Sequence, residues 1–262
     1  MTHQTNNVIE LPYALDANRF LSALDGANRS ALAPHLQLCH VETGEILCDA
    51  GSTLPAVYFP VTTAVSLQYT MAGKTTLGVA EIGCEGVVCD DVVGGDSAMP
   101  RRVVVYRGGF AYRLDTRRFD DACDASPLIR RQIFMRVQIV LAQISQTLFC
   151  SRHHPMQHQL GRWLLIAHDR SRSVEIPVTH GMLGQMLGQM LGVRRETITD
   201  TAQTLQKLGL IHQHRGSVVL TDPVALASAT CGCHRVIRDE ARRIFAFDRE
   251  TRVPTECRVH TL

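Results

Sequence analysis

The sequence has few aromatic residues and almost no lysine. Aromatic side chains make up 5% of the 262 residues, with one tryptophan, so a surface built on stacked nucleobases is not expected. Only Lys74 and Lys207 are lysines among the 27 basic residues. Nearly every positive charge is therefore an arginine, whose planar guanidinium can bind phosphate or guanine through two hydrogen bonds. A GC-rich genome would produce the same bias, so the arginines alone identify no ligand.

Common catalytic motifs and membrane signals are also missing. There is no nucleophile elbow, phosphate-binding loop, HExxH or paired-carboxylate motif, so we do not expect an enzyme. The longest charge-free stretch, residues 50–73, is interrupted by Pro55 and Pro60, and the N-terminus lacks a signal-peptide pattern. The nine cysteines are an odd number spread singly along the chain, unlike a secreted disulfide scaffold. We therefore expect a cytoplasmic protein without a membrane partner.

What the sequence does contain is an ordinary globular composition with an uneven charge distribution. Hydrophobic residues make up 45% and charged residues 20%, and the length predicts about two domains. Residues 1–149 carry 12 basic and 15 acidic side chains, whereas residues 150–262 carry 15 and 10. This asymmetry favours a front half for sensing or assembly and a back half that binds a polyanion.

The front half has the pattern of short strands. Segments rich in β-branched and aromatic residues are separated by glycine and proline turns, at residues 56–60, 64–70, 75–82 and 101–106. Such spacing predicts an antiparallel β-roll or sandwich. We assign residues 1–126 to this sensor or effector domain of an α+β protein.

A long helix is predicted next, over residues 127–151. Apolar residues recur in steps of four and three, as in the seam of a coiled coil. A core helix packed on the roll is the alternative, but the length and position favour a seam between two subunits. The predicted seam residues are Ile133, Val137, Val140, Ile144 and Thr147.

Residues 152–262 contain the most informative pattern, a helix–turn–helix. This motif needs a small residue four positions before its turn glycine, and apolar residues around the turn. Gly188 and Gly192 meet the first need, and Leu191, Val193 and Ile198 meet the second. Residues 210–221 then have the pattern of a β-hairpin with Arg215-Gly216 at its tip, so we predict a winged helix–turn–helix with a C-terminal extension.

The winged module predicts contacts with double-stranded DNA. The N-terminal residues of a recognition helix face the floor of the major groove, where arginine recognises guanine and glutamate accepts from cytosine. Residues that cap the first helix or lie on the wing are placed for phosphates; the alternative is that all of these are ordinary solvated residues. Predicted base contacts are Arg194, Arg195, Glu196, Thr199 and Asp200, and predicted phosphate contacts are Thr179, Thr197, His212, His214 and Arg215.

With these residues the chain resembles the Crp/Fnr family of bacterial transcription regulators, nearly from end to end. The resemblance implies a cyclic-nucleotide-binding-like roll, a long dimerisation helix, and a winged helix on palindromic DNA, with a homodimer and RNA polymerase as partners. It rests on residues 57–60, 65–67, 83–86, 150–154, 161–165, 167–169, 190–195 and 209–211.

Two departures from the family concern its ligands. Cyclic-nucleotide-binding members carry a phosphate cassette, whereas residues 84–99 match it poorly and only Arg101 or Arg102 resembles the phosphate-binding arginine. Asp90 and Asp91 would repel a phosphate. No cysteine precedes Cys39, so an N-terminal iron–sulfur cluster is not expected. We expect no cofactor, and the effector, if any, stays open.

A third departure is a tandem repeat. Residues 183–186 (LGQM) recur at once as residues 187–190, and deleting one copy restores the family spacing between Thr179 and Arg194. Four extra residues lengthen a helix by about 6 Å. We expect this surplus to shift Thr179 away from its phosphate, which would weaken DNA affinity without changing base preference.

Cys231, Cys233 and His234 form a cluster that suggests metal or redox sensing. Tetrahedral zinc needs four ligands, and no second pair lies at the usual spacing, so ordinary packing is the favoured interpretation and metal or redox sensing is the alternative. A metal- or redox-sensing or cyclic-nucleotide-responsive regulator, and an interaction protein with a degenerate DNA module, are the alternative functions.

Overall fold

The computed structural model describes residues 14–70, 76–89, 98–171, 173–177, 187–188 and 191–251. The chain divides into two compact units. The first consists of Met1–Val65 and Ile82–Gln132, and the second of Ser66–Glu81 and Ile133–Leu262. Residues 66–81, which the sequence pattern assigns to the roll, thus belong with the C-terminal half. The division at 126 and 151 stays a prediction.

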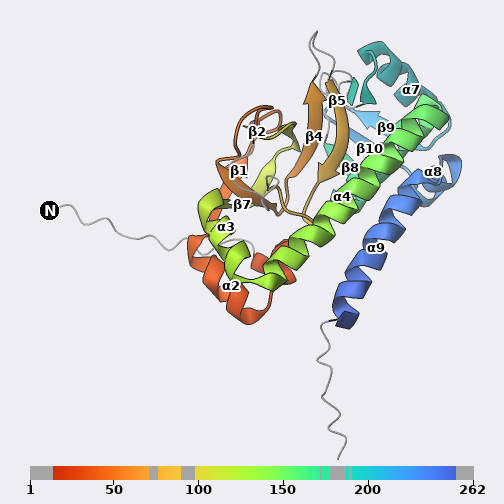
Figure 1. The fold of residues 1–262 in the computed structure, drawn as a ribbon. Coiled ribbons are helices and arrows are strands. Elements are labelled where there is room, and N and C mark those ends of the chain that lie inside the picture. Colours follow the sequence, from red (N-terminus) through yellow and green to blue (C-terminus); the bar gives the residue numbers. More distant parts are fainter. Residues whose placement is uncertain are drawn as a thin grey trace, which may run out of the picture. The chain divides into compact units, whose positions relative to one another are not determined.

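Antiparallel strands build the N-terminal part, as predicted (Figure 1). One sheet has the order β1-β7-β3 and the other β2-β6-β4-β5. In the first, β3 and β7 pair from Ala56↔Asp115 to Pro60↔Ala111. The strands are β1 Gln37–Val41, β2 Ile46–Cys48, β3 Ala56–Pro60, β4 Ala64–Thr70, β5 Thr76–Ile82, β6 Arg102–Arg107 and β7 Gly109–Asp115.

Short helices close the first unit around an aromatic core. Phe20, Phe59 and Phe119 are fully buried, with ring centroids 5.6 to 6.1 Å apart. The buried amide of Asn18 donates to the carbonyls of Pro60 and Gly86, 2.9 Å from each, and its oxygen caps the following helix. The helices are η1 Leu15–Ala17, α1 Arg19–Ser22, α2 Gly26–Leu32, η2 Ala33–His35 and α3 Thr116–Ala125.

The second unit is mostly helical. Its centre is α5, where nine consecutive residues from Gln159 to Ala167 are buried. Its small sheet has the order β8-β10-β9. Besides most of β4 and β5, its elements are α4 Pro127–His153 (which begins in the first unit), α5 Met156–Ser171, β8 Glu175–Pro177, α7 Arg195–Lys207, β9 Ile211–His214, β10 Ser217–Leu220, α8 Pro223–Ala229 and α9 Cys233–Thr251.

The predicted long helix is confirmed as α4, and α9 lies beside it (Figure 1). The Arg136 guanidinium of α4 stacks on the Phe245 ring of α9, 4.9 Å from its centroid. Nearer the other end of α4, Gln146 donates to the sulfur of Cys233, the first residue of α9. The two helices therefore run in opposite directions.

A buried polar network holds β5 against α4 and α5. The Arg170 guanidinium lies 2.9 Å from the Glu81 carboxylate and also donates to the Glu81 carbonyl oxygen. Gln143 donates to the same carboxylate at 2.8 Å and accepts from Arg170. Both charged side chains are at least nine-tenths buried, and this network explains why residues 66–81 belong to the second unit.

The sequence pattern does not predict β1, β7 or β8. β7 begins at Gly109, which follows another glycine, and such a pair usually indicates a break. β1 is a mixed polar and apolar segment that pairs with β7 alone, and β8 has three residues. In the part of the chain that the structure describes, α4 alone is long and apolar enough to span a membrane by length and composition. Core helices of soluble proteins meet the same criteria.

Candidate nucleic-acid interface

The turn before α7 has the geometry that the glycine pattern predicts. Gly192 has φ +67°, a conformation that side chains other than glycine rarely adopt. The Val193 amide donates to the Gly188 carbonyl at 2.8 Å. A Cβ on Gly188 would lie 2.9 Å from the Val193 carbonyl oxygen, so the close approach of the two segments depends on this glycine.

Apolar side chains on one face of α7 pack into the interior of the second unit. Ile198, Ala202 and Leu205 are almost fully buried, and α7 contacts α5. Gly209 ends the helix with φ +71°, and the Leu210 amide donates to the Leu205 carbonyl at 3.0 Å. This closing pattern is a Schellman motif, as the glycine at this position predicts.

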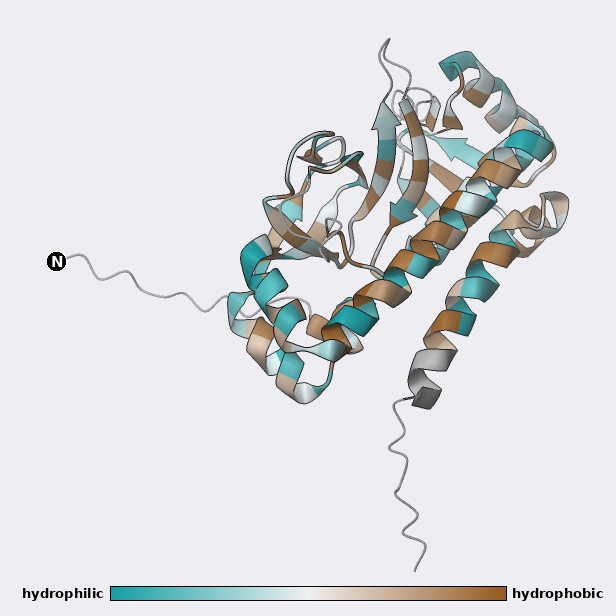
Figure 2. Cartoon of the chain, viewed as in Figure 1, coloured by the Kyte–Doolittle hydropathy of each residue, from teal (hydrophilic) through white to brown (hydrophobic). Residues whose placement is uncertain are grey.

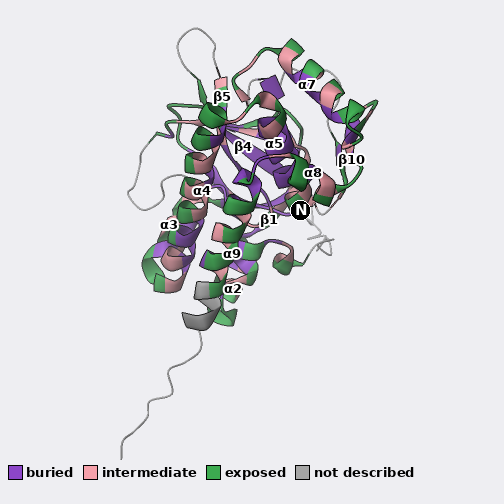
Figure 3. Cartoon of the chain, turned by 90° about the vertical axis from the view of Figure 1, so that its right-hand side faces the viewer, coloured by how far each residue is buried: buried purple, intermediate pink, exposed green. Residues whose placement is uncertain are grey.

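The opposite face of α7 carries the predicted base-contacting residues, and Figure 3 shows exposed positions on this helix in green. Arg194, Arg195, Glu196 and Asp200 are exposed, and Thr199 is half-buried. The Thr199 hydroxyl donates back to the Arg195 carbonyl at 3.2 Å. Since helical residues advance by about 100° each, residues 195, 196, 199 and 200 share one face, which is polar and free of apolar side chains.

The predicted wing is confirmed as the β9–β10 hairpin. Its tip is Arg215-Gly216, with φ +99° at the glycine. His212, His214 and Arg215 are exposed, and the two imidazole rings lie 4.5 Å apart. The Gln213 amide donates to the Gln206 side chain of α7 at 2.9 Å, which fixes the wing beside the helix.

Of the two remaining predicted phosphate contacts, one is less accessible and the other is not among the described residues. Thr197 is half-buried, and its carbonyl accepts from the Thr201 hydroxyl. Thr179 and residues 183–186 lie outside the described residues. The expected effect of the tandem repeat therefore stays a prediction.

The two arginines proposed for an effector lie in the first unit. Arg102 forms a bidentate ion pair with Asp49, at 2.8 and 3.1 Å. Its hydrogen bond is the main reason why the pKa of Asp49 lies below its usual value. Arg101 is half-buried. Because the Arg102 guanidinium is already engaged by a carboxylate, the structure gives no support to a phosphate site there.

The predicted seam residues of α4 have different environments. Val137 is exposed, but Ile133 is buried, and the Thr147 hydroxyl accepts from Arg162 at 2.9 Å. Val140 and Ile144 are half-buried. The apolar residues that are at least half exposed on α4 instead include Phe134, Val137, Leu141 and Leu148. Figure 2 shows hydrophobic positions, in brown, along the length of this helix.

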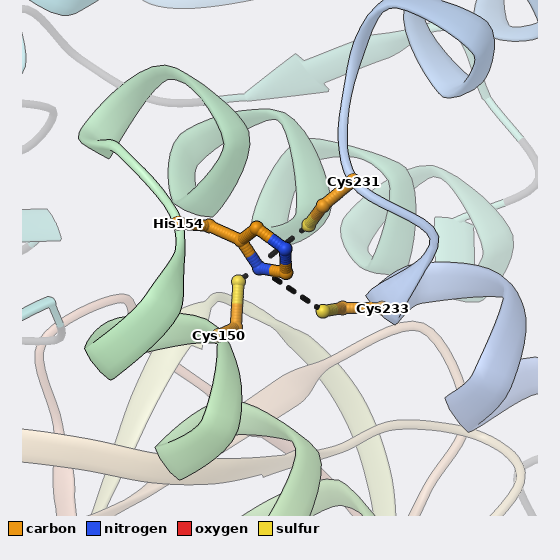
Figure 4. Close-up of side chains that lie close together, drawn as sticks. All are labelled: Cys150, His154, Cys231 and Cys233. Atoms are coloured by element: carbon orange, nitrogen blue, oxygen red, sulfur yellow. Dashed lines mark hydrogen bonds between the residues drawn. The ribbon is translucent and has the colours of Figure 1, made fainter.

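The three residues predicted as a possible metal site, Cys231, Cys233 and His234, do not form one cluster. His234 lies 2.7 Å from the Asp169 carboxylate, and this hydrogen bond, with nearby positive charge, lowers the pKa of Asp169 against the opposing effect of its burial. Cys231 and Cys233 instead meet Cys150 and His154 from the end of α4 (Figure 4). Burial raises the pKa of Cys150 to about 12 and also raises that of Cys233.

Sequence reasoning missed Cys150 and His154 as partners of this cluster. Their spacing of four along a helix was a usable signal, since such residues share a face. The two halves of the cluster are 81 residues apart in the sequence, so only the fold brings them together.

A comparison with known proteins identifies the module. Residues 158–229 match the family model of the Crp-like helix-turn-helix domain. No curated protein matches the chain.

Solved structures resemble the chain over most of its length. FixK2 from Bradyrhizobium japonicum is 13% identical with a TM-score of 0.63, over 75% of this chain and 98% of that one. The c-di-GMP responsive regulator CLP of Xanthomonas campestris is 16% identical with a TM-score of 0.60, over 75% and 99%. TTHB099, a CRP-family regulator of Thermus thermophilus, is 13% identical with a TM-score of 0.60, over 72% and 95%. The resemblance to the Crp/Fnr regulators is thus confirmed: the chain has their fold and carries a Crp-like helix-turn-helix domain.

Proposed function

We propose that this protein is a sequence-specific transcription regulator that binds double-stranded DNA as a homodimer. The observation that carries the proposal is the exposed polar face of α7, with Arg194 as its N-cap and Arg195 and Glu196 on its first turn, beside the arginine-tipped wing. This face lies within the residues that match the Crp-like helix-turn-helix domain. Arginine and glutamate on the first turn suit the edges of a G·C pair in the major groove.

The homodimer is supported by the exposed apolar stripe of α4. Phe134, Val137, Leu141 and Leu148 follow steps of three, four and seven, the spacing of a coiled-coil seam. Large apolar side chains seldom stay exposed in such a row on a monomer. Two copies joined along this stripe would present two recognition helices to a palindromic site with half-sites one turn of DNA apart.

The proposal is tested by selecting bound fragments from random DNA with the purified full-length protein. We expect a two-fold symmetric consensus, and an affinity that falls steeply as salt rises because phosphate contacts release counterions. Binding with a salt dependence but no consensus would favour the interaction protein with a degenerate DNA module.

The seam is tested by Leu141→Glu, with Leu141→Met as the matched control. We expect the glutamate to give monomers in sedimentation or light scattering and to abolish binding to the full palindrome, because two like charges would meet in an apolar seam. The methionine variant should stay dimeric. A dimer that survives Leu141→Glu contradicts the proposed seam.

The same proposal includes a cytoplasmic location, RNA polymerase as a partner and the absence of enzymatic activity.

A further inference from the structure

Four metal-ligating side chains converge inside the second unit (Figure 4). Cys150 lies in the last turn of α4 and His154 directly follows that helix, while Cys231 and Cys233 flank a single glycine at the start of α9. The three sulfurs and one imidazole nitrogen all lie within 4.8 Å of one another. The cysteines are buried and His154 is half-buried.

Two of the distances between these atoms match the edges of a tetrahedron around a zinc ion, and the others are at most 4.8 Å. With Zn–S bonds of about 2.3 Å and Zn–N bonds of about 2.0 Å, neighbouring ligand atoms lie roughly 3.5–3.8 Å apart. The Cys150 and Cys231 sulfurs are 3.6 Å apart, and the Cys233 sulfur is 3.5 Å from Nδ1 of His154. All three cysteines are free, and 3.6 Å is far longer than a disulfide bond of about 2.05 Å.

The surroundings of the cluster suit an anionic metal centre. The Gln146 amide donates to the Cys233 sulfur at 3.1 Å, a contact that orients a ligand and stabilises a thiolate. Arg162 is 2% exposed and lies close enough to Cys150 to influence it electrostatically. Among the described residues no carboxylate forms an ion pair with Arg162, whose Nε has no hydrogen-bond partner.

A buried guanidinium beside three neutral thiols would be an uncompensated charge, which is costly. Three thiolates and a neutral imidazole around a divalent ion give a centre with net charge −1, which compensates Arg162. Cys231 also lines a cleft of about 680 Å³ between α5, α8 and α9.

We propose that Cys150, His154, Cys231 and Cys233 bind one Zn²⁺ in a closed, structural site. Binding converts three thiols to thiolates and releases three protons to the solvent, with no change of oxidation state. Three sulfurs and one nitrogen in a tetrahedral arrangement are a ligand set that structural zinc commonly takes. The ion joins the end of α4 to the start of α9, next to the first residues of the helix-turn-helix domain.

Metal analysis of the purified full-length protein tests the proposal directly. We expect about one zinc per chain, released when the cysteines are modified with a mercurial reagent. After replacement by Co²⁺ we expect the intense visible bands of a tetrahedral cobalt–thiolate site. Alkylation should label all three cluster cysteines quickly only after a chelator has removed the metal.

Two histidine variants distinguish the proposed zinc site from the neighbouring His234–Asp169 hydrogen bond. His154→Ala removes a ligand and should weaken zinc binding by more than about 100-fold, because even changes outside the ligand shell cost about 10–100-fold. His234→Ala removes an equally sized imidazole that follows Cys233 but bonds Asp169, and it should retain the metal. Cys150→Ser should lose zinc, whereas Cys123→Ser, at a buried cysteine of the first unit, should retain it.

Three results would overturn the proposal. The first is that the protein, purified in the presence of zinc, contains no zinc and its cluster thiols react with an alkylating reagent as fast as they do after chelator treatment. Another is zinc retained by both His154→Ala and Cys150→Ser. The last is a disulfide between Cys150 and Cys231 in the freshly isolated protein. Circular dichroism of each variant shows whether it is folded. If Cys150→Ser does not fold, Co²⁺ binding to the folded His154→Ala variant decides the test: an unchanged Co²⁺ spectrum and affinity would contradict the proposal.

Discussion

The face of α7 and the interior of the second unit use polar side chains in opposite ways. At the start of α7, the N-cap Arg194 and the helical residues Arg195 and Glu196 are exposed and contiguous in sequence. In the interior, Glu81 and Arg170 are buried partners 89 residues apart. Exposed groups interact with whatever arrives from solvent, whereas buried groups must find partners within the chain. We therefore expect the first set to determine the DNA sequence preference and the second to determine the free energy of unfolding.

The largest expected effect comes from breaking the buried ion pair. Glu81→Ala leaves the Arg170 guanidinium buried without its carboxylate, and removing one partner of such a pair costs about 3–5 kcal/mol. We expect the free energy of unfolding to fall by this amount in denaturant titrations. Glu81→Gln, which keeps a hydrogen-bond acceptor, is the milder matched variant.

The preferred DNA sequence of folded Glu81→Ala should be unchanged. A consensus that differs from that of the original protein would contradict the claim that Glu81 affects stability and not DNA sequence preference.

The converse experiment is Arg195→Ala. Loss of one good base contact costs about 1–3 kcal/mol, or roughly 5- to 150-fold in affinity for the best site. Specificity should relax at one base of each half-site, while the free energy of unfolding changes little because the side chain is exposed. Competition binding to a panel of single-base variants measures this. An intact preference would show that Arg195 does not contact that base.

Gly188→Ala is expected to affect both DNA binding and stability. Its new Cβ would lie 2.9 Å from a backbone carbonyl, so the turn before α7 must shift, at a cost of about 1–3 kcal/mol. We expect a loss of DNA affinity larger than the loss of stability, measured by parallel binding and thermal melts. Gly209→Ala is the control, because alanine is strained there by a φ of +71° but its Cβ would meet nothing within 4 Å. Equal losses of DNA affinity for the two variants would contradict the role of Gly188 in the turn.

Arg215→Ala should have the smallest effect. A phosphate contact at the wing tip adds affinity that does not depend on sequence, so binding should weaken evenly for all sites. The slope of log affinity against log salt should fall by about one per half-site. A change in the consensus would instead place Arg215 against a base edge.

Local sequence patterns predicted the parts of the fold that depend on neighbouring residues. The strands at 56–60 and 64–70, the long helix from Pro127, and the turn at Gly192 all have short-range causes: alternation, periodicity and glycine. The Cys150–His154–Cys231–Cys233 cluster and the Glu81–Arg170 pair do not, because each joins segments 81 or 89 residues apart. The seam of α4 lies between these cases. Its periodicity is evident in the sequence, but which side of the helix is covered depends on the rest of the fold, in which Ile133 is buried and Leu141 is exposed.

The ion pair of Arg170 also sets a rule for recombining such proteins. A chimaera that joins a foreign sensor to this protein at the start of the long helix would discard Glu81 and leave Arg170 and Gln143 facing whatever strand the donor supplies. A graft that carries residues 66–81 along with the C-terminal half keeps those partners together, so the natural boundary for exchange follows the hydrogen bonds of β5 and not the first residue of the helix.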